Sequence, residues 1–119
     1  MYHALMLEGY LDVLNLLPEN HPDAPFFEET CRKMTAAMQA FVHPDGSLAL
    51  FNDSTQEIAL APEVLCSYAD ALLKKRPAPR LDLPDTGYHV FRDDGWYFAA
   101  DTGPAGPDYL MAHAHADVF

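Results

Sequence analysis

Three polar side chains alternate with alanine near the end of the sequence, at His113, His115 and Asp117. In an extended strand, residues two positions apart project from the same face, so these side chains are expected to lie in one row. Imidazole is a common metal ligand and transfers protons near neutral pH, and a neighbouring carboxylate can complete a metal site or orient a ring. The spacing therefore favours a functional site over a polar edge strand, which the same alternation would also allow.

The chain that must position this row has 119 residues, and half of these residues are apolar. That length and composition suffice for one domain with a hydrophobic core. The sequence ends on Val118 and Phe119, in what reads as the middle of a strand, without a turn or a polar tail. We therefore expect the chain to be a fragment of a longer protein.

The charge of the chain is strongly negative, with 18 acidic residues, 7 basic residues and a formal net charge of −11. A nucleic acid or an anionic membrane binds to clustered lysine and arginine, so neither is an expected partner. No apolar run reaches the length of a membrane span, and the first residues do not have the pattern of a secretory signal. The sequence makes no prediction of oligomeric state.

Apolar residues recurring every three or four positions predict three helices, over residues 2–17, about 24–42, and 62–75. Pro18 ends the first pattern, and Pro62 fits the first turn of the third helix. On the first helix we predict an apolar face made of six residues: Leu5, Met6, Tyr10, Val13, Leu14 and Leu17.

The pattern changes after residue 76, where a proline-rich segment at 77–87 reads as a linker. Two alternating, aromatic-rich runs follow at 88–92 and 96–100, and the turn between them contains Asp94 and Gly95, a strong hairpin signal. The predicted fold class is therefore α+β, with helices over residues 1–76 and antiparallel β structure over 88–119. A ligand cleft is expected where the two architectures meet.

The isolated cysteines and histidines carry less information. Cys31 and Cys66 lack the close spacing of a zinc or redox site and are expected to be buried free thiols. Four further histidines are interpreted as surface or turn residues: His3, His21, His43 and His89.

Several of these motifs together resemble the heparinase II/III family, which contains polysaccharide lyases. The resemblance lies in the run Gly87-Tyr-His-Val-Phe-Arg-Asp-Asp-Gly-Trp-Tyr-Phe98, in Asp101-Thr-Gly-Pro104, and in His113-Ala-His-Ala-Asp117. The opening Met1-Tyr-His-Ala-Leu-Met-Leu-Glu-Gly-Tyr-Leu-Asp12 also resembles a late helix of that family. The resemblance implies the end of an incomplete (α/α) toroid followed by the start of an antiparallel β-sandwich.

The resemblance also implies β-elimination on a polysaccharide that contains uronic acid, such as an alginate- or heparin-like polymer. Tyr2 would be the catalytic acid and base, and His113 would assist at the substrate carboxylate or as a base. His115 would bind a structural zinc ion whose other ligands follow residue 119. Trp96 and Tyr109 would contact the sugar. The strong negative charge favours a non-sulfated polymer, because a sulfated one needs a basic cleft. The fragment is expected to be inactive alone, and the family suggests a periplasmic or secreted protein, with a cytoplasmic one still open.

Two other functions remain open from the residues themselves. The run from His113 to Asp117 has the first five positions of the HxHxDH signature of metal-dependent hydrolases, but Val118 replaces the final histidine. A non-catalytic carbohydrate-binding module would instead use Trp96, Tyr97 and Tyr109 as a platform for sugar rings.

Overall fold

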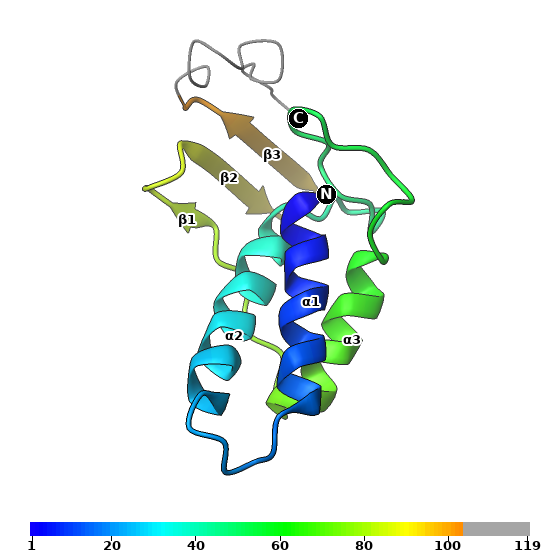
Figure 1. Cartoon of the computed structure of the whole chain (residues 1–119). Helices are drawn as coiled ribbons and strands as arrows, with labels where there is room; N and C mark the ends of the chain where they lie inside the picture. Colours follow the sequence, from blue (N-terminus) through cyan, green and yellow to red (C-terminus); the bar gives the residue numbers. More distant parts are fainter. Residues whose placement is uncertain (104–119) are drawn as a thin grey trace, which may run out of the picture.

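The computed structural model describes residues 1–103, which form three helices and a small antiparallel sheet (Figure 1). This arrangement confirms the α+β class and the antiparallel hairpin. The elements in chain order are α1 (Tyr2–Leu16), α2 (Ala24–Ala40), α3 (Pro62–Leu73), β1 (Asp82–Leu83), β2 (Tyr88–Asp93) and β3 (Trp96–Asp101). Within the described part of the chain, no helix is long and apolar enough to cross a membrane.

Each helix ends one or two residues earlier than the sequence pattern predicts, for local reasons. Leu17 has an extended backbone (φ −70°, ψ 136°) because the ring of Pro18 disfavours a helical conformation in the residue before it. Lys74 has a left-handed backbone (φ 62°), which caps α3 and turns the chain away from the helix.

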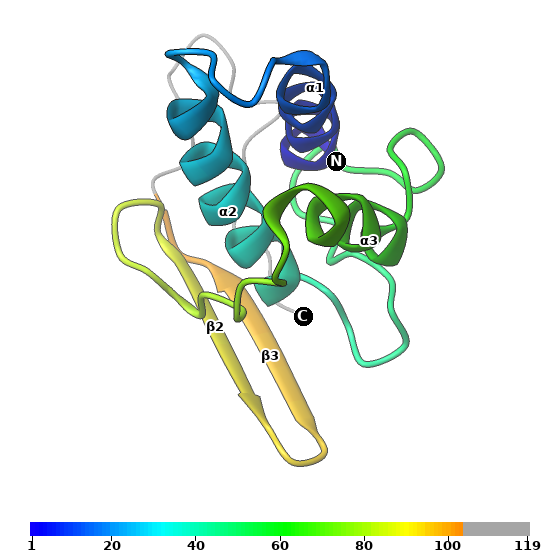
Figure 2. The same cartoon turned by 90° about the horizontal axis from the view of Figure 1, so that it is seen from below.

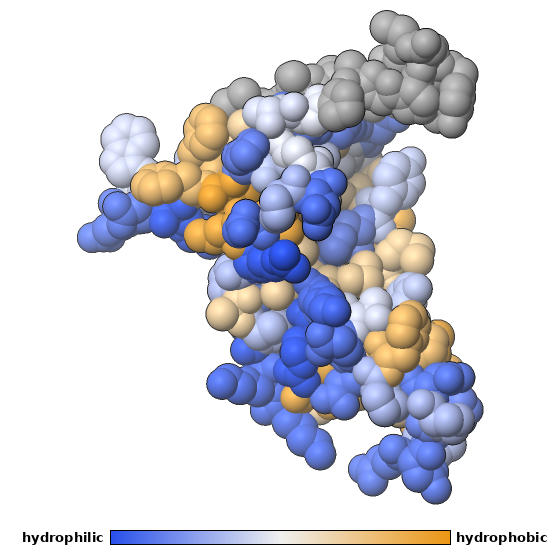
Figure 3. Space-filling view, turned by 90° about the vertical axis from the view of Figure 1, so that its left-hand side faces the viewer, coloured by the Kyte–Doolittle hydropathy of each residue, from blue (hydrophilic) through white to orange (hydrophobic). Residues whose placement is uncertain are grey.

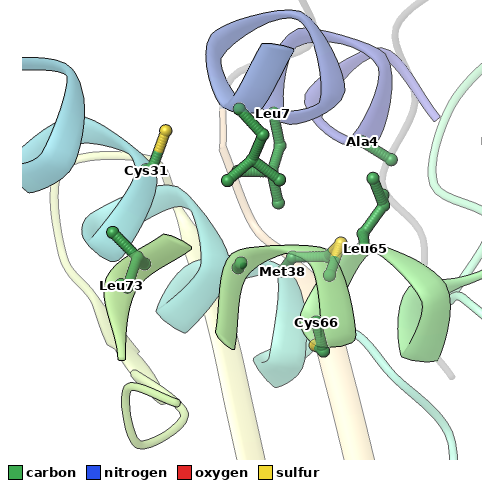
Figure 4. Close-up of a cluster of buried hydrophobic side chains, with 9 residues drawn as sticks. Ala4, Leu7, Cys31, Met38, Leu65, Cys66 and Leu73 are labelled. Carbon is green, nitrogen blue, oxygen red and sulfur yellow. The ribbon is translucent and has the colours of Figure 1, made fainter. Parts of the chain in front are cut away.

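The three helices share one hydrophobic core, and α1 faces it with Ala4, Leu7 and Leu11. Figure 4 shows Ala4 and Leu7 pointing toward α2 and α3. The predicted apolar face of α1 was partly wrong, because Met6 is 54% exposed and Val13 is 38% exposed. Leucine and alanine at positions 4, 7 and 11 also follow a helical spacing, and this second stripe includes the small residue that allows helices to approach closely.

The sheet has the strand order β1-β2-β3, and its hairpin register pairs Tyr88 with Asp101 and Phe91 with Phe98. One face of the hairpin packs on a second core that contains Phe51 and Ala99, with Phe41 at the end of α2 against it. The hairpin extends beyond the end of α2 (Figure 2). The packing of Phe41 on this second core therefore holds the sheet beside the end of α2.

The opposite face of the hairpin is apolar and exposed. Phe91, Trp96 and Phe98 are 56%, 75% and 45% exposed, and Figure 3 shows hydrophobic side chains gathered at the sheet end of the molecule among hydrophilic ones.

The segment between α3 and β2, which includes the predicted linker at 77–87, is hydrogen-bonded to α2. The Gln39 side chain donates a hydrogen bond to the carbonyl of Pro77 (2.8 Å), and the backbone N–H of Arg80 donates to the carbonyl of Ala36 (2.9 Å). Strand β1 also lies inside this segment and pairs with Tyr88 and His89. These contacts fix the β residues against the helices, while the division into two domains stays a prediction.

Candidate active site

A cavity of about 640 Å³ lies where the helices meet the sheet. Its volume is within the range of sites that bind small molecules or single sugar units. The helical wall includes Tyr2 and His3 at the start of α1 and Phe41 after α2. The opposite wall comes from the loop after α2 and from the sheet, with Asn52, Asp53, Thr86, Tyr88 and Asp101. The cavity is thus located at the boundary where the sequence predicts a cleft.

Tyr2 is the first residue of α1 and is 67% exposed. Because the helix begins here, the tyrosine side chain stands at the end of α1 that faces the cavity, rather than in the helical core. Its phenol is therefore available to a ligand in the cavity, and its catalytic role stays a prediction.

His3 follows Tyr2 and connects α1 to α2. Its Nε2 atom lies 2.8 Å from the carbonyl oxygen of Met34. A carbonyl only accepts hydrogen bonds, so Nε2 must carry the proton, and this contact anchors the start of α1 beside Tyr2. His3 is exposed, as expected, yet it also lines the cavity, which its position in the sequence did not indicate.

Three residues far apart in the sequence form a polar cluster on the opposite wall. The Asn52 side-chain nitrogen lies 3.4 Å from the Tyr88 hydroxyl and 3.5 Å from Oδ2 of Asp101. Tyr88 and Asp101 are direct neighbours across the β2–β3 pair. Sequence reasoning missed this cluster, because Asn52 reads only as a turn residue and the hairpin register is what joins the other two.

Aromatic packing and backbone geometry hold this cluster in place. The Tyr88 ring meets the rings of Phe41 and Phe51 edge-on, with centroids 5.1 and 5.0 Å away. Asn52 has a left-handed backbone (φ 53°), a conformation that asparagine adopts more readily than most residues other than glycine. The Oδ1 atom of Asp101 accepts a hydrogen bond of 3.0 Å from the backbone N–H of Gly103.

Gly87, between the cavity-lining residues Thr86 and Tyr88, approaches Gly103 closely. A Cβ atom on Gly87 would lie 2.6 Å from the Cα of Gly103, and Gly87 also has a positive φ of 76°. We expect Gly87→Ala to lower the free energy of unfolding by about 2–3 kcal/mol, because a left-handed backbone and a steric overlap both oppose the new methyl group. Urea denaturation measures this loss.

Gly46 provides the matched control for this substitution. It has a similar φ of 88°, but a Cβ atom there would meet nothing within 4 Å. Gly46→Ala should cost only about 1 kcal/mol from the backbone conformation. Equal losses for the two variants would show that the contact between the two glycines has no energetic weight.

The structure places the other predicted site residues away from the cavity or does not describe them. Trp96 lies at the far end of the hairpin, opposite Asp93, and is not among the residues that line the cavity. Tyr109, His113, His115 and Asp117 lie outside the described residues. The roles proposed for these residues stay predictions.

The two cysteines are both buried and free, as the sequence predicts. Burial raises the pKa of the Cys31 thiol to about 11 and also raises the pKa of Cys66. Both thiols are therefore protonated near neutral pH and are poor nucleophiles. Among residues 1–103, no three His, Cys, Asp or Glu side chains are grouped as metal ligands would be.

A helical layer and an antiparallel sheet that share a cavity define an α+β protein with a candidate site between its two parts. Residues 75–119 match the family model described as Heparinase II/III-like, C-terminal. This match confirms the resemblance for the part of the chain that contains the sheet. No curated protein and no solved structure matches the chain.

Proposed function

We propose that the chain is part of a polysaccharide lyase that cleaves a uronic acid polymer by β-elimination. The observation that carries the proposal is that Tyr2 lines the same cavity as Tyr88 and Asp101, which belong to the heparinase II/III-like segment. A phenol from the helices would then face a sugar-binding wall from the sheet. In this proposal the helices are the last ones of an (α/α) toroid, and the strands begin a β-sandwich.

The proposed reaction needs one group that both accepts and donates a proton. Tyr2, as phenolate, would take the C5 proton of the uronic acid, and the electrons of that bond would form the C4–C5 double bond. The C4–O bond would break, and the Tyr2 hydroxyl would return the proton to the leaving oxygen. His113 would assist at the substrate carboxylate, where hydrogen-bond donors stabilise the developing enolate. Tyr109 would contact a neighbouring sugar unit, whereas Trp96 lies at the far end of the hairpin and on its opposite face, so it has no part in this proposal.

The test is turnover of uronate polymers by the full-length protein. A lyase leaves an unsaturated sugar at each new end, so ultraviolet absorbance should rise as the polymer shortens. New reducing ends without that absorbance would instead support a hydrolase, and binding without cleavage would support a carbohydrate-binding module. Either result would reject the proposed function.

The family resemblance also leads us to propose a structural zinc ion with His115 as one ligand. Imidazole nitrogen suits zinc, and a bound zinc ion would tie together strands that are far apart in the sequence. We expect His115→Ala to lower both the zinc content and the melting temperature of the full-length protein, because metal binding contributes to folding stability. Metal analysis and thermal denaturation measure the two effects.

His89 is the control for this prediction, because it is an exposed histidine of β2 in the same matched segment. His89→Ala should leave both the zinc content and the melting temperature close to those of the unchanged protein. If His115→Ala retains all its zinc, His115 is not a ligand.

A further inference from the structure

The sheet side of the cavity has a particular chemistry. Asn52, Tyr88 and Asp101 supply an amide, a phenol and a carboxylate within one cluster, and Asp53 adds a second carboxylate to the lining. No lysine or arginine side chain from residues 1–103 lines the cavity. Carboxylate and amide groups bind the hydroxyl groups of sugars through hydrogen bonds, whereas sulfate groups are bound by arginine and lysine.

The cluster is also arranged as a binding site would be. Asn52, Tyr88 and Asp101 are half-buried, and Tyr88 is held between two phenylalanine rings. One oxygen of Asp101 accepts a hydrogen bond of 3.0 Å from the backbone N–H of Gly103, and the other lies 3.5 Å from the side-chain nitrogen of Asn52, a long contact. A sugar hydroxyl placed between these groups would donate to the carboxylate and accept from the amide, at shorter distances than the present contact.

We propose that Asn52, Tyr88 and Asp101 form a subsite that recognises hydroxyl groups of a non-sulfated sugar unit. This inference rests on the proposed lyase function and narrows its substrate to polymers without sulfate at this position. A sulfate ester there would lose the hydrogen bond that a hydroxyl donates to Asp101. It would also place a negative charge beside the carboxylates of Asp101 and Asp53, in a cavity that screens charges less than water does.

The test compares one non-sulfated uronate polymer with the same polymer after chemical O-sulfation, so that backbone and linkage are matched. The full-length protein is expected to have a kcat/KM at least tenfold higher on the non-sulfated form. Asp101→Asn keeps the shape and an acceptor for Gly103 but removes the charge, so it should reduce this preference severalfold. Asp85→Asn changes the net charge equally at an exposed position outside the cavity, and should leave the preference unchanged.

Asn52→Gly tests the amide separately, because glycine tolerates the left-handed backbone at this position. We expect KM for the non-sulfated polymer to rise about tenfold, with kcat changed less than twofold. This split indicates lost binding, whereas a folding defect would lower the amount of active protein and therefore kcat.

Two outcomes would overturn the subsite. One is equal or better cleavage of the sulfated polymer, and the other is an unchanged preference in Asp101→Asn. Titration calorimetry with non-sulfated and sulfated oligosaccharides separates this inference from the proposed function. Preferential binding of the non-sulfated form without cleavage of either polymer would support the subsite and reject the lyase. Equal binding of both forms would reject the subsite whether or not cleavage occurs.

Discussion

Replacing Tyr2 with phenylalanine is expected to lower kcat on a uronate polymer by about 10²–10⁴-fold, the range of a lost general acid or base. The substitution removes one hydroxyl group from a side chain that is 67% exposed and lies outside the helical core. The free energy of unfolding should therefore not change. Steady-state kinetics on the full-length protein, together with urea denaturation, measure both expectations.

Tyr10 is the matched control, because it is a tyrosine of the same helix whose ring packs against Phe27, with centroids 5.5 Å apart. It is not among the residues that line the cavity. Tyr10→Phe keeps this ring packing and should leave kcat within about twofold of the unchanged enzyme. Full activity in Tyr2→Phe would assign the proton transfer to another residue, and an equal loss in both variants would indicate a general effect on α1.

The sequence was sufficient to predict the three helices and the β2–β3 hairpin, because strong local signals mark where they begin or turn, but it missed β1, which lies inside the predicted linker. Pro18 and Pro62 delimit two of the helices, and Asp94 with Gly95 marks the hairpin turn. The conformation of each of these residues depends mainly on its nearest neighbours, so a sequence pattern captures it. The order of the helices and the hairpin along the chain follows directly from the positions of these residues.

The site was harder to predict, because it depends on contacts between distant residues. The family resemblance pointed to Tyr2, and the structure places Tyr2 in the cavity. The partners on the other wall are joined only by tertiary structure, since Asn52 and Asp101 are 49 positions apart. A side-chain contact at that separation depends on how the loop and the hairpin pack, and periodicity carries no information about it.

The face that α1 buries shows the limit of periodicity most clearly. This helix is apolar around much of its circumference, so two stripes fit a helical spacing: one with Met6 and Val13, and one with Leu7 and Leu11. Local pattern cannot choose between them. The choice depends on which stripe fits α2 and α3, and the stripe with Leu7 brings Ala4 into the contact, where its small side chain allows the helices to pack closely.

Leu7→Ala is therefore expected to lower the free energy of unfolding by about 2–5 kcal/mol, because it leaves a cavity at a fully buried position. Met6→Ala, one residue away and 54% exposed, should cost less than about 1 kcal/mol. Alanine favours a helix at both positions, so the difference reports burial alone. Urea denaturation should show a lower midpoint for Leu7→Ala with an unchanged slope. A larger loss in Met6→Ala would mean that α1 packs on its other stripe.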